Sequence, residues 1–198
     1  MNKRNYQKEL DNLLDSMDGK KKLLLHCCCG PCSTYVTEYL HEFFDITLFF
    51  YNPNITEEQE YIKRKEELLR YYAEVGYGKE IKFIDADYEP ERFLQAAKGL
   101  EKEPERGKRC LKCFELRLGV TAAAAKNGGF DYFCTTLSIS PYKNADDIMM
   151  IGEAEGKKAG VPYLVSDFKK KGGYKRSIEL SNEYDMYRQN YCGCIFSK

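Results

Sequence analysis

The chain alternates short apolar runs with longer segments of helical periodicity. The apolar runs predict five strands, at 22–27, 46–52, 81–85, 130–136 and 161–168. Apolar residues at helical spacing predict helices at about 3–17, from Pro31 onwards, from Thr56 to Val75, before Gly128, at 145–160 and at 177–190. Because strands that are separated by helices pair in parallel, the pattern indicates an α/β fold, a parallel sheet with helices on both faces.

Two helix starts carry local signals. Pro31 occupies a position that suits the first turn of a helix, where a missing N–H costs nothing. Thr56 and Gln59 have the spacing of a capping box, in which each side chain bonds a backbone N–H at the start of the helix. We therefore expect one helix to begin at Pro31 and the next at Thr56.

The length predicts a single domain. A chain of 198 residues with 43% hydrophobic content can bury a substantial core. We expect one α/β domain over 1–198 that carries a cysteine-rich metal site, with an N-terminal helix in 1–20 and a Cys-x-Cys tail at 190–198.

Charge and hydropathy limit the partners. Lys and Arg number 31 and so do Asp and Glu, so contact with a nucleic acid requires a local basic patch. The N-terminus lacks the apolar core of a signal peptide, and no apolar run approaches the roughly 20 residues that span a bilayer. The sequence therefore predicts a cytoplasmic protein without a membrane partner.

Cysteine is the residue type that points to chemistry. In a reducing compartment, an odd number of cysteines, nine, favours metal ligation or redox chemistry over structural disulfides. The predicted strand ends, helix starts and tail hold all of them: Cys27, Cys28, Cys29, Cys32, Cys110, Cys113, Cys134, Cys192 and Cys194. Sites in open parallel sheets lie beyond the carboxyl ends of the strands, where several of these thiols fall.

Three interpretations compete for these cysteines. Cys29-Gly30-Pro31-Cys32 is the thioredoxin signature, but Trp is absent from the chain and further cysteines flank the motif. Two Cys-x-x-Cys pairs suit a structural zinc, which leaves the vicinal cysteines and the tail pair without a role. An iron–sulfur cluster fits better, because such clusters use thiolates that are held close together and partly shielded.

Four motifs together resemble one family. "LLHCCCGPCS", "RCLKCFELRL", "TTLSISPYK" and "YCGCIFS" occur in this order between Leu23 and Ser197. They are similar to the cobalamin-independent epoxyqueuosine reductases, the QueH type. The resemblance implies a three-layer fold of the adenine-nucleotide hydrolase-like (HUP-like) class. It also implies a cytosolic iron–sulfur oxidoreductase that removes the epoxide oxygen of epoxyqueuosine at the wobble position of tRNA, the last step of queuosine biosynthesis.

The resemblance also implies site residues. Its ligand set for a 4Fe-4S cluster falls on Cys28, Cys29, Cys110 and Cys113, and adjacent cysteines are able to bind two different irons of one cluster. Cys32 is either a thiol on the helix face or a substitute or second-metal ligand.

The Cys-x-Cys tail resembles the family's redox pair. Cys192 and Cys194 would form a redox-active disulfide, and a bridge between residues only two apart requires the backbone freedom of Gly193. The alternative is that the two thiolates bind an additional mononuclear iron beside the cluster.

The implied reaction sets further requirements. Conversion of an epoxide into an alkene and water takes two electrons and two protons, and the electrons must come from an external donor protein or reductant. Because a 4Fe-4S cluster passes one electron at a time, a second redox centre at Cys192 and Cys194 meets a stoichiometric need. Tyr142 and Lys143 are the candidate proton donors, with Asp87 and His26 as weaker ones.

Candidate contacts to the anticodon loop are basic. The segment 168–176, "FKKKGGYKR", interleaves cations with aromatic residues, and the region of the second cysteine pair adds Lys108, Arg109, Lys112 and Arg117. Two rivals remain. A cluster-dependent tRNA sulfur transferase would need an ATP-binding Ser-Gly-Gly-x-Asp-Ser loop where this chain has "HCCCGPCS". A zinc-stabilised RNA-binding module would leave the tail cysteines without a role.

Overall fold

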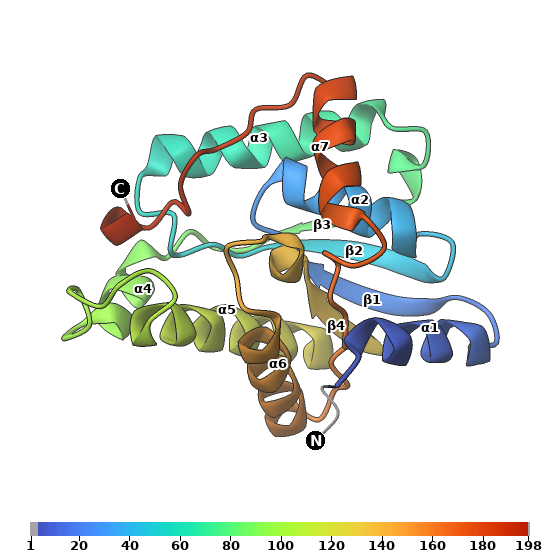
Figure 1. Ribbon diagram of the computed structural model, residues 1–198, viewed down its shortest axis with the longest axis horizontal. Helices are drawn as coiled ribbons and strands as arrows, with labels where there is room; N and C mark the ends of the chain where they lie inside the picture. Colours follow the sequence, from blue (N-terminus) through green and yellow to red (C-terminus); the bar gives the residue numbers. More distant parts are fainter. Residues whose placement is uncertain (1–3, 198) are drawn as a thin grey trace.

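Four parallel strands form the sheet at the centre of the molecule, in the order β3-β2-β1-β4 (Figure 1). The structure is a computed structural model that describes residues 4–197, so residues 1–3 and 198 of the predicted N-terminal helix and tail lie outside it. The strands are β1 (Lys21–His26), β2 (Phe44–Phe50), β3 (Lys82–Asp85) and β4 (Tyr132–Thr135).

Helices cover both faces of this sheet. They are α1 (Tyr6–Ser16), α2 (Gly30–Leu40), α3 (Glu58–Glu74), α4 (Pro90–Ala97), α5 (Lys108–Asn127), α6 (Ala145–Ala159) and α7 (Gly173–Glu183), with short 3-10 turns at Gly78–Glu80, Thr136–Ile139 and Ile195–Ser197. Helices α2, α3 and α7 lie on one face, and α1, α5 and α6 lie on the other (Figure 1). This arrangement confirms the predicted three-layer α/β fold.

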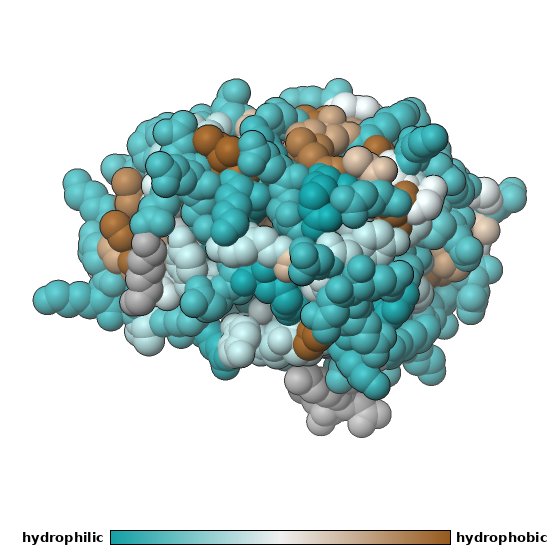
Figure 2. Space-filling view, turned by 90° about the horizontal axis from the view of Figure 1, so that it is seen from above, coloured by the Kyte–Doolittle hydropathy of each residue, from teal (hydrophilic) through white to brown (hydrophobic). Residues whose placement is uncertain are grey.

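The position of β1 inside the sheet explains why its sequence is apolar. β1 pairs with both β2 and β4, and Leu23, Leu24 and Leu25 are fully buried. A parallel strand that is covered on both faces has no polar side, so its side chains read as a continuous apolar run. The surface on the side of α3 and α7 is mostly hydrophilic, with apolar residues scattered in small groups (Figure 2). No helix in the described residues is both long and apolar enough to cross a bilayer.

The predicted fifth strand is wrong. Segment 161–168 forms one isolated bridge to β4, between Phe133 and Tyr163. The Phe133 N–H donates to Pro162 O, and the Leu164 N–H donates to Phe133 O. The ladder stops there because Pro162 has no N–H to donate and because the Cys134 thiol takes the Leu164 carbonyl.

Two helix predictions need correction, and one helix is additional. Helix α3 is capped by Glu57 without a side-chain hydrogen bond, so the capping box of Thr56 does not form. The Thr56 N–H donates instead to Gly193 O of the tail. Helix α7 begins and ends earlier than the predicted 177–190, and Asp185, with φ 45°, turns the chain away from the helix. Helix α4 was not predicted.

The buried β1 strand provides a stability test. We expect Leu24→Ala to lower the free energy of unfolding by about 2–5 kcal/mol, because it leaves a cavity in a strand that packs on both faces. Leu94→Ala is the matched control, since Leu94 is 46% exposed and its loss should cost less than about 0.5 kcal/mol. Chemical denaturation measures both, and equal costs would contradict the assigned core.

Candidate metal and redox site

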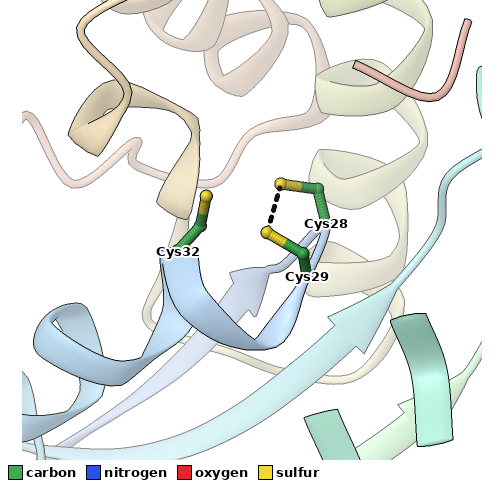
Figure 3. A group of neighbouring side chains, drawn as sticks. All are labelled: Cys28, Cys29 and Cys32. Carbon is green, nitrogen blue, oxygen red and sulfur yellow. Dashed lines mark hydrogen bonds between the residues drawn. The ribbon is translucent and has the colours of Figure 1, made fainter. Parts of the chain in front are cut away.

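The loop between β1 and α2 gathers three thiols. Cys28, Cys29 and Cys32 place their Sγ atoms within 4.8 Å of one another (Figure 3). The Sγ atoms of Cys28 and Cys29 are 3.8 Å apart. Cys29 is the extended residue before α2, and Pro31 in the first turn carries Cys32 onto the same side. The loop therefore presents a set of soft sulfur donors at the carboxyl end of the central strand.

These three thiols do not ionise alike. Hydrogen bonds from Cys29 and Cys32, helped by the charge of Arg117, hold the pKa of Cys28 well below its usual range. The hydrogen bond to Cys28 raises the pKa of Cys29 to about 12, and the same kind of contact raises the pKa of Cys32. One thiolate is thus stabilised by two thiols, and a metal that bound all three would release protons.

A buried arginine faces thiols from three segments. The Arg117 side chain on α5 is 1% exposed, and its Nη2 donates to Asn52 Oδ1 at 2.6 Å. Burial alone would lower its pKa, but interactions with Cys113, Cys28 and Cys192 outweigh that effect and raise it. Arg117 is therefore a buried cation that faces these cysteines. Because it also lines a cavity of about 350 Å³, its role as a tRNA contact stays a prediction.

His26 is a core residue with satisfied hydrogen bonds. Its Nδ1 is 2.8 Å from Thr135 Oγ1 and its Nε2 is 3.0 Å from Tyr51 O. Burial and the Arg117 charge lower its pKa to about 3, so the ring is neutral. A fully buried neutral imidazole is a poor proton donor for a substrate.

The second cysteine pair and the tail pair share one cavity. Cys110, Cys113, Cys192 and Cys194 all line a small cavity of about 30 Å³. A larger cavity of about 350 Å³ adjoins it and is lined by Cys28, Cys32 and again Cys192. Cys192 therefore stands where the two cavities meet.

Individual contacts distinguish the thiols of the small cavity. The Arg106 N–H donates to Cys110 Sγ at 3.3 Å. Burial raises the pKa of Cys113 to about 12 and also raises the pKa of Cys194.

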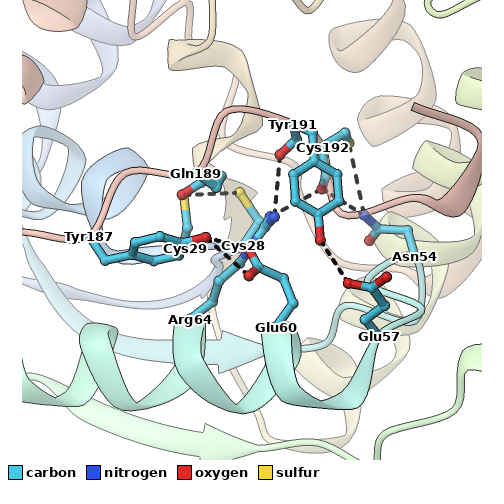
Figure 4. A network of polar contacts seen from close by, with 10 residues as sticks. All are labelled: Cys28, Cys29, Asn54, Glu57, Glu60, Arg64, Tyr187, Gln189, Tyr191 and Cys192. Carbon is cyan, nitrogen blue, oxygen red and sulfur yellow. Dashed lines mark hydrogen bonds and ion pairs between the residues drawn. The ribbon is translucent and has the colours of Figure 1, made fainter. Parts of the chain in front are cut away.

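An arginine on α3 fixes the tail against the sheet. Arg64 is 2% exposed and forms an ion pair with Glu60 at 2.6 Å. Its Nη1 donates to Cys192 O at 3.1 Å and its Nη2 to Tyr191 O at 3.3 Å (Figure 4). Gly193, with φ 98°, lets the backbone pass closely over this guanidinium. Arg64 thereby sets the position of the Cys-x-Cys tail.

Two amides link the tail to the thiols. Gln189 Nε2 donates to Cys29 Sγ at 2.9 Å, and Asn54 Nδ2 lies 3.9 Å from Cys192 Sγ (Figure 4). The Oε1 of Gln189 and the Oδ1 of Asn54 are buried and have no hydrogen-bond partner among the described residues. Buried acceptors without a partner beside a group of thiols suit a site that holds a further group.

The structure places the predicted proton donors differently. Lys143 lines both cavities, and its Nζ is 3.6 Å from Cys192 Sγ. Tyr142 also lines both cavities but is 63% exposed. Asp87 is exposed in the loop after β3 and lines neither cavity. The structure thus brings Lys143 and Tyr142 to the cysteines and leaves Asp87 apart.

Other predicted RNA contacts are structural. Arg109 is 3% exposed, and its Nη1 donates to the carbonyls of Leu100, Glu101 and Glu103. Lys169 bonds Ser138 O at 2.7 Å. Lys171 pairs with Asp11 at 2.7 Å. The prediction is wrong for Arg109. Within residues 4–197, Lys170 is an exposed cation of the run that forms no ion pair.

Sequence reasoning missed Arg64, Gln189 and Asn54. Arg64 carried a signal, since it occupies a position on the face of α3 that also buries Tyr61 and Leu68. A cation at such a position needs partners. Gln189 and Asn54 lie in irregular segments, where no periodicity marks a buried side chain.

Fold and site together define the class: an α/β protein with a multi-thiol centre at the carboxyl end of a parallel sheet. The family described as "Epoxyqueuosine reductase QueH" matches residues 23–198. The chain is 45% identical to the epoxyqueuosine reductase QueH of Staphylococcus epidermidis, over 98% of this chain and 84% of that protein. It is 46% identical to that of Streptococcus pyogenes serotype M1, over 90% and 71%. It is 37% identical to that of Thermotoga maritima, over 88% and 89%. The chain belongs to the QueH family, which confirms the resemblance in its motifs.

The tail anchor provides a test. In Arg64→Ala we expect the alkylation rate of Cys192 to rise about tenfold or more, because hydrogen bonds from a charged donor contribute about 1.5–3 kcal/mol each and their loss lets the tail open. Mass spectrometry of the alkylated peptide, on reduced protein, measures the rate. Arg92→Ala is the control, since Arg92 is half exposed and pairs only locally with Glu89. An unchanged rate in folded Arg64→Ala would rule out this anchor.

Proposed function

We propose that this chain is an iron–sulfur epoxyqueuosine reductase that converts epoxyqueuosine at the tRNA wobble position into queuosine. The observation that carries the proposal is the convergence of cysteines from both ends of the chain on two adjoining cavities, in a member of the QueH family. Because thiols from residues 28–32 and 192–194 meet there, we also propose that residues 1–198 act as a single domain.

We propose that Cys28, Cys29, Cys110 and Cys113 hold a 4Fe-4S cluster. The donor set suits it: Cys28 and Cys29 are adjacent, Cys28 ionises readily, and Arg117 interacts with both Cys28 and Cys113. Cys32 lies within reach of the same metal and is the substitute ligand. When bound, the cluster supplies electrons one at a time.

Cys192 and Cys194 are proposed as the second redox centre. Oxidation of the two thiols to a disulfide releases two electrons and two protons, which equals what the epoxide consumes on becoming an alkene and water. An external reductant, a donor protein or a small thiol, must then restore the pair. The alternative is an additional mononuclear iron at the same thiols, and the position of Cys192 at both cavities is compatible with either.

Lys143 is the residue best placed to deliver a proton. Its Nζ is 3.6 Å from Cys192 Sγ, and both residues line the two cavities. An ammonium group there can hydrogen-bond the epoxide oxygen and protonate it as negative charge develops. Tyr142 also lines both cavities and remains a candidate donor, whereas Asp87 lies outside the two cavities.

Metal analysis tests the cluster ligands. We expect anaerobically purified protein to be brown and to contain iron and sulfide, and Cys110→Ala to lose most of both. Cys134→Ala is the matched control, because its buried thiol bonds Leu164 O and Ser166 and lines neither cavity. If Cys110 is a cluster ligand and Cys32 is not, Cys32→Ala should retain its iron and sulfide. A colourless protein with stoichiometric zinc would contradict the proposal and favour a structural RNA-binding module.

Turnover tests the proton donor. We expect Lys143→Gln to slow epoxide reduction about 100-fold or more, which is the usual contribution of a general acid. Lys143→Arg keeps the charge but gives up its proton far less readily, so it should remain slow. Single-turnover assays on epoxyqueuosine-containing tRNA, at matched iron content, measure the rate. Full activity in Lys143→Arg would mean that only the charge matters.

A further inference from the structure

One tight turn carries both the Lys143 ammonium group and the exposed aromatic ring of Tyr142. Ser140, Pro141, Tyr142 and Lys143 form a turn in which the Lys143 N–H donates to Ser140 O at 3.2 Å. Pro at the second position restricts the backbone, and the Tyr142 N–H donates to Ser140 Oγ at 3.3 Å. The turn directs Lys143 toward Cys192 and leaves the neighbouring Tyr142 ring exposed.

The Tyr142 ring is mostly exposed and so contributes little to the hydrophobic core. Tyr142 is 63% exposed, and the other large hydrophobic side chains exposed in the described residues are aliphatic. It nevertheless lines both cavities that contain the cysteines. The Arg106 guanidinium lies 6.0 Å from the centre of the ring. The Arg106 cation thus lies over the Tyr142 ring where both residues line the small cavity.

Resting on the proposed function, we propose that Tyr142 is the stacking platform for the wobble base of the tRNA. RNA-binding proteins recognise unpaired loop bases largely by stacking on aromatic rings and arginine planes. The larger cavity, about 350 Å³, has the size of a site for one small ligand and is too small for a duplex. A base stacked on Tyr142 directs its substituent inward to Lys143 and Cys192. Tyr142 is therefore a binding residue, and the stacking does not require its hydroxyl.

Two substitutions separate the ring from the hydroxyl. Tyr142→Ala removes both, and Tyr142→Phe removes the hydroxyl alone. We measure binding of an anticodon stem-loop RNA to the holoprotein by fluorescence anisotropy, with 2-aminopurine at the wobble position as a second readout. Met150→Ala is the control, because Met150 is 60% exposed on α6 and lines neither cavity.

The expected pattern is specific. Tyr142→Ala should weaken binding about 5-fold to 150-fold, the range that one stacked base corresponds to, and abolish the quenching of 2-aminopurine. Tyr142→Phe should bind within about twofold of wild type and keep the quenching, because it retains the ring. Met150→Ala should match wild type.

Other outcomes overturn the proposal. If Tyr142→Ala binds and quenches like wild type, Tyr142 is no platform. If Tyr142→Phe loses binding and quenching as Tyr142→Ala does, the hydroxyl makes the contact and the ring is no stacking platform. If wild type binds the RNA and reduces epoxyqueuosine while Tyr142→Ala is unaffected, only this inference fails. If wild type neither binds nor reduces, the proposed function fails with it.

Discussion

A buried positive charge is the constraint on which the rest of the site depends. Arg117 lies in the interior at 1% exposure, so its charge must be balanced locally. Asn52 after β2 accepts one hydrogen bond, the readily ionised Cys28 thiol supplies negative charge, and Cys113 and Cys192 interact with the same guanidinium. One side chain thereby couples the loop after β1, helix α5 and the tail. Cysteines from all three segments interact with this one guanidinium.

The tail is the second element that completes the site. It leaves α7 at Glu183, passes back over α3 and brings Cys192 to the junction of the two cavities. The Arg64 guanidinium donates hydrogen bonds to the carbonyls of Tyr191 and Cys192, and the Thr56 N–H donates to Gly193 O. These hydrogen bonds fix the segment that carries Cys192 and Cys194. Here it is fixed beside the Lys143 ammonium group, which also faces the cavities.

Local patterns predicted most of the fold and failed where tertiary contacts replaced local ones. The strands β1 and β2 were recognisable because burial on both faces demands a continuous apolar run. Segment 161–168 is also rich in apolar residues, yet Pro162 has no N–H for a ladder and the Cys134 thiol bonds the Leu164 carbonyl. Thr56 has the pattern of a cap, but its N–H serves the tail. Arg117 and Arg109 looked like surface cations, and only the fold shows them as interior.

The sequence by itself determined the α/β class, the order of its cysteine motifs and the family to which they belong, because periodicity and motif spacing are properties of the chain. Tertiary structure alone decided which thiols meet. Cys28 and Cys192 are far apart in sequence, and their approach depends on Arg64, Arg117 and the path of the tail. It also separated Asp87 from the site and exposed Tyr142 at the cavity mouth. Burial and charge balance arise from packing between segments, and no local pattern encodes them.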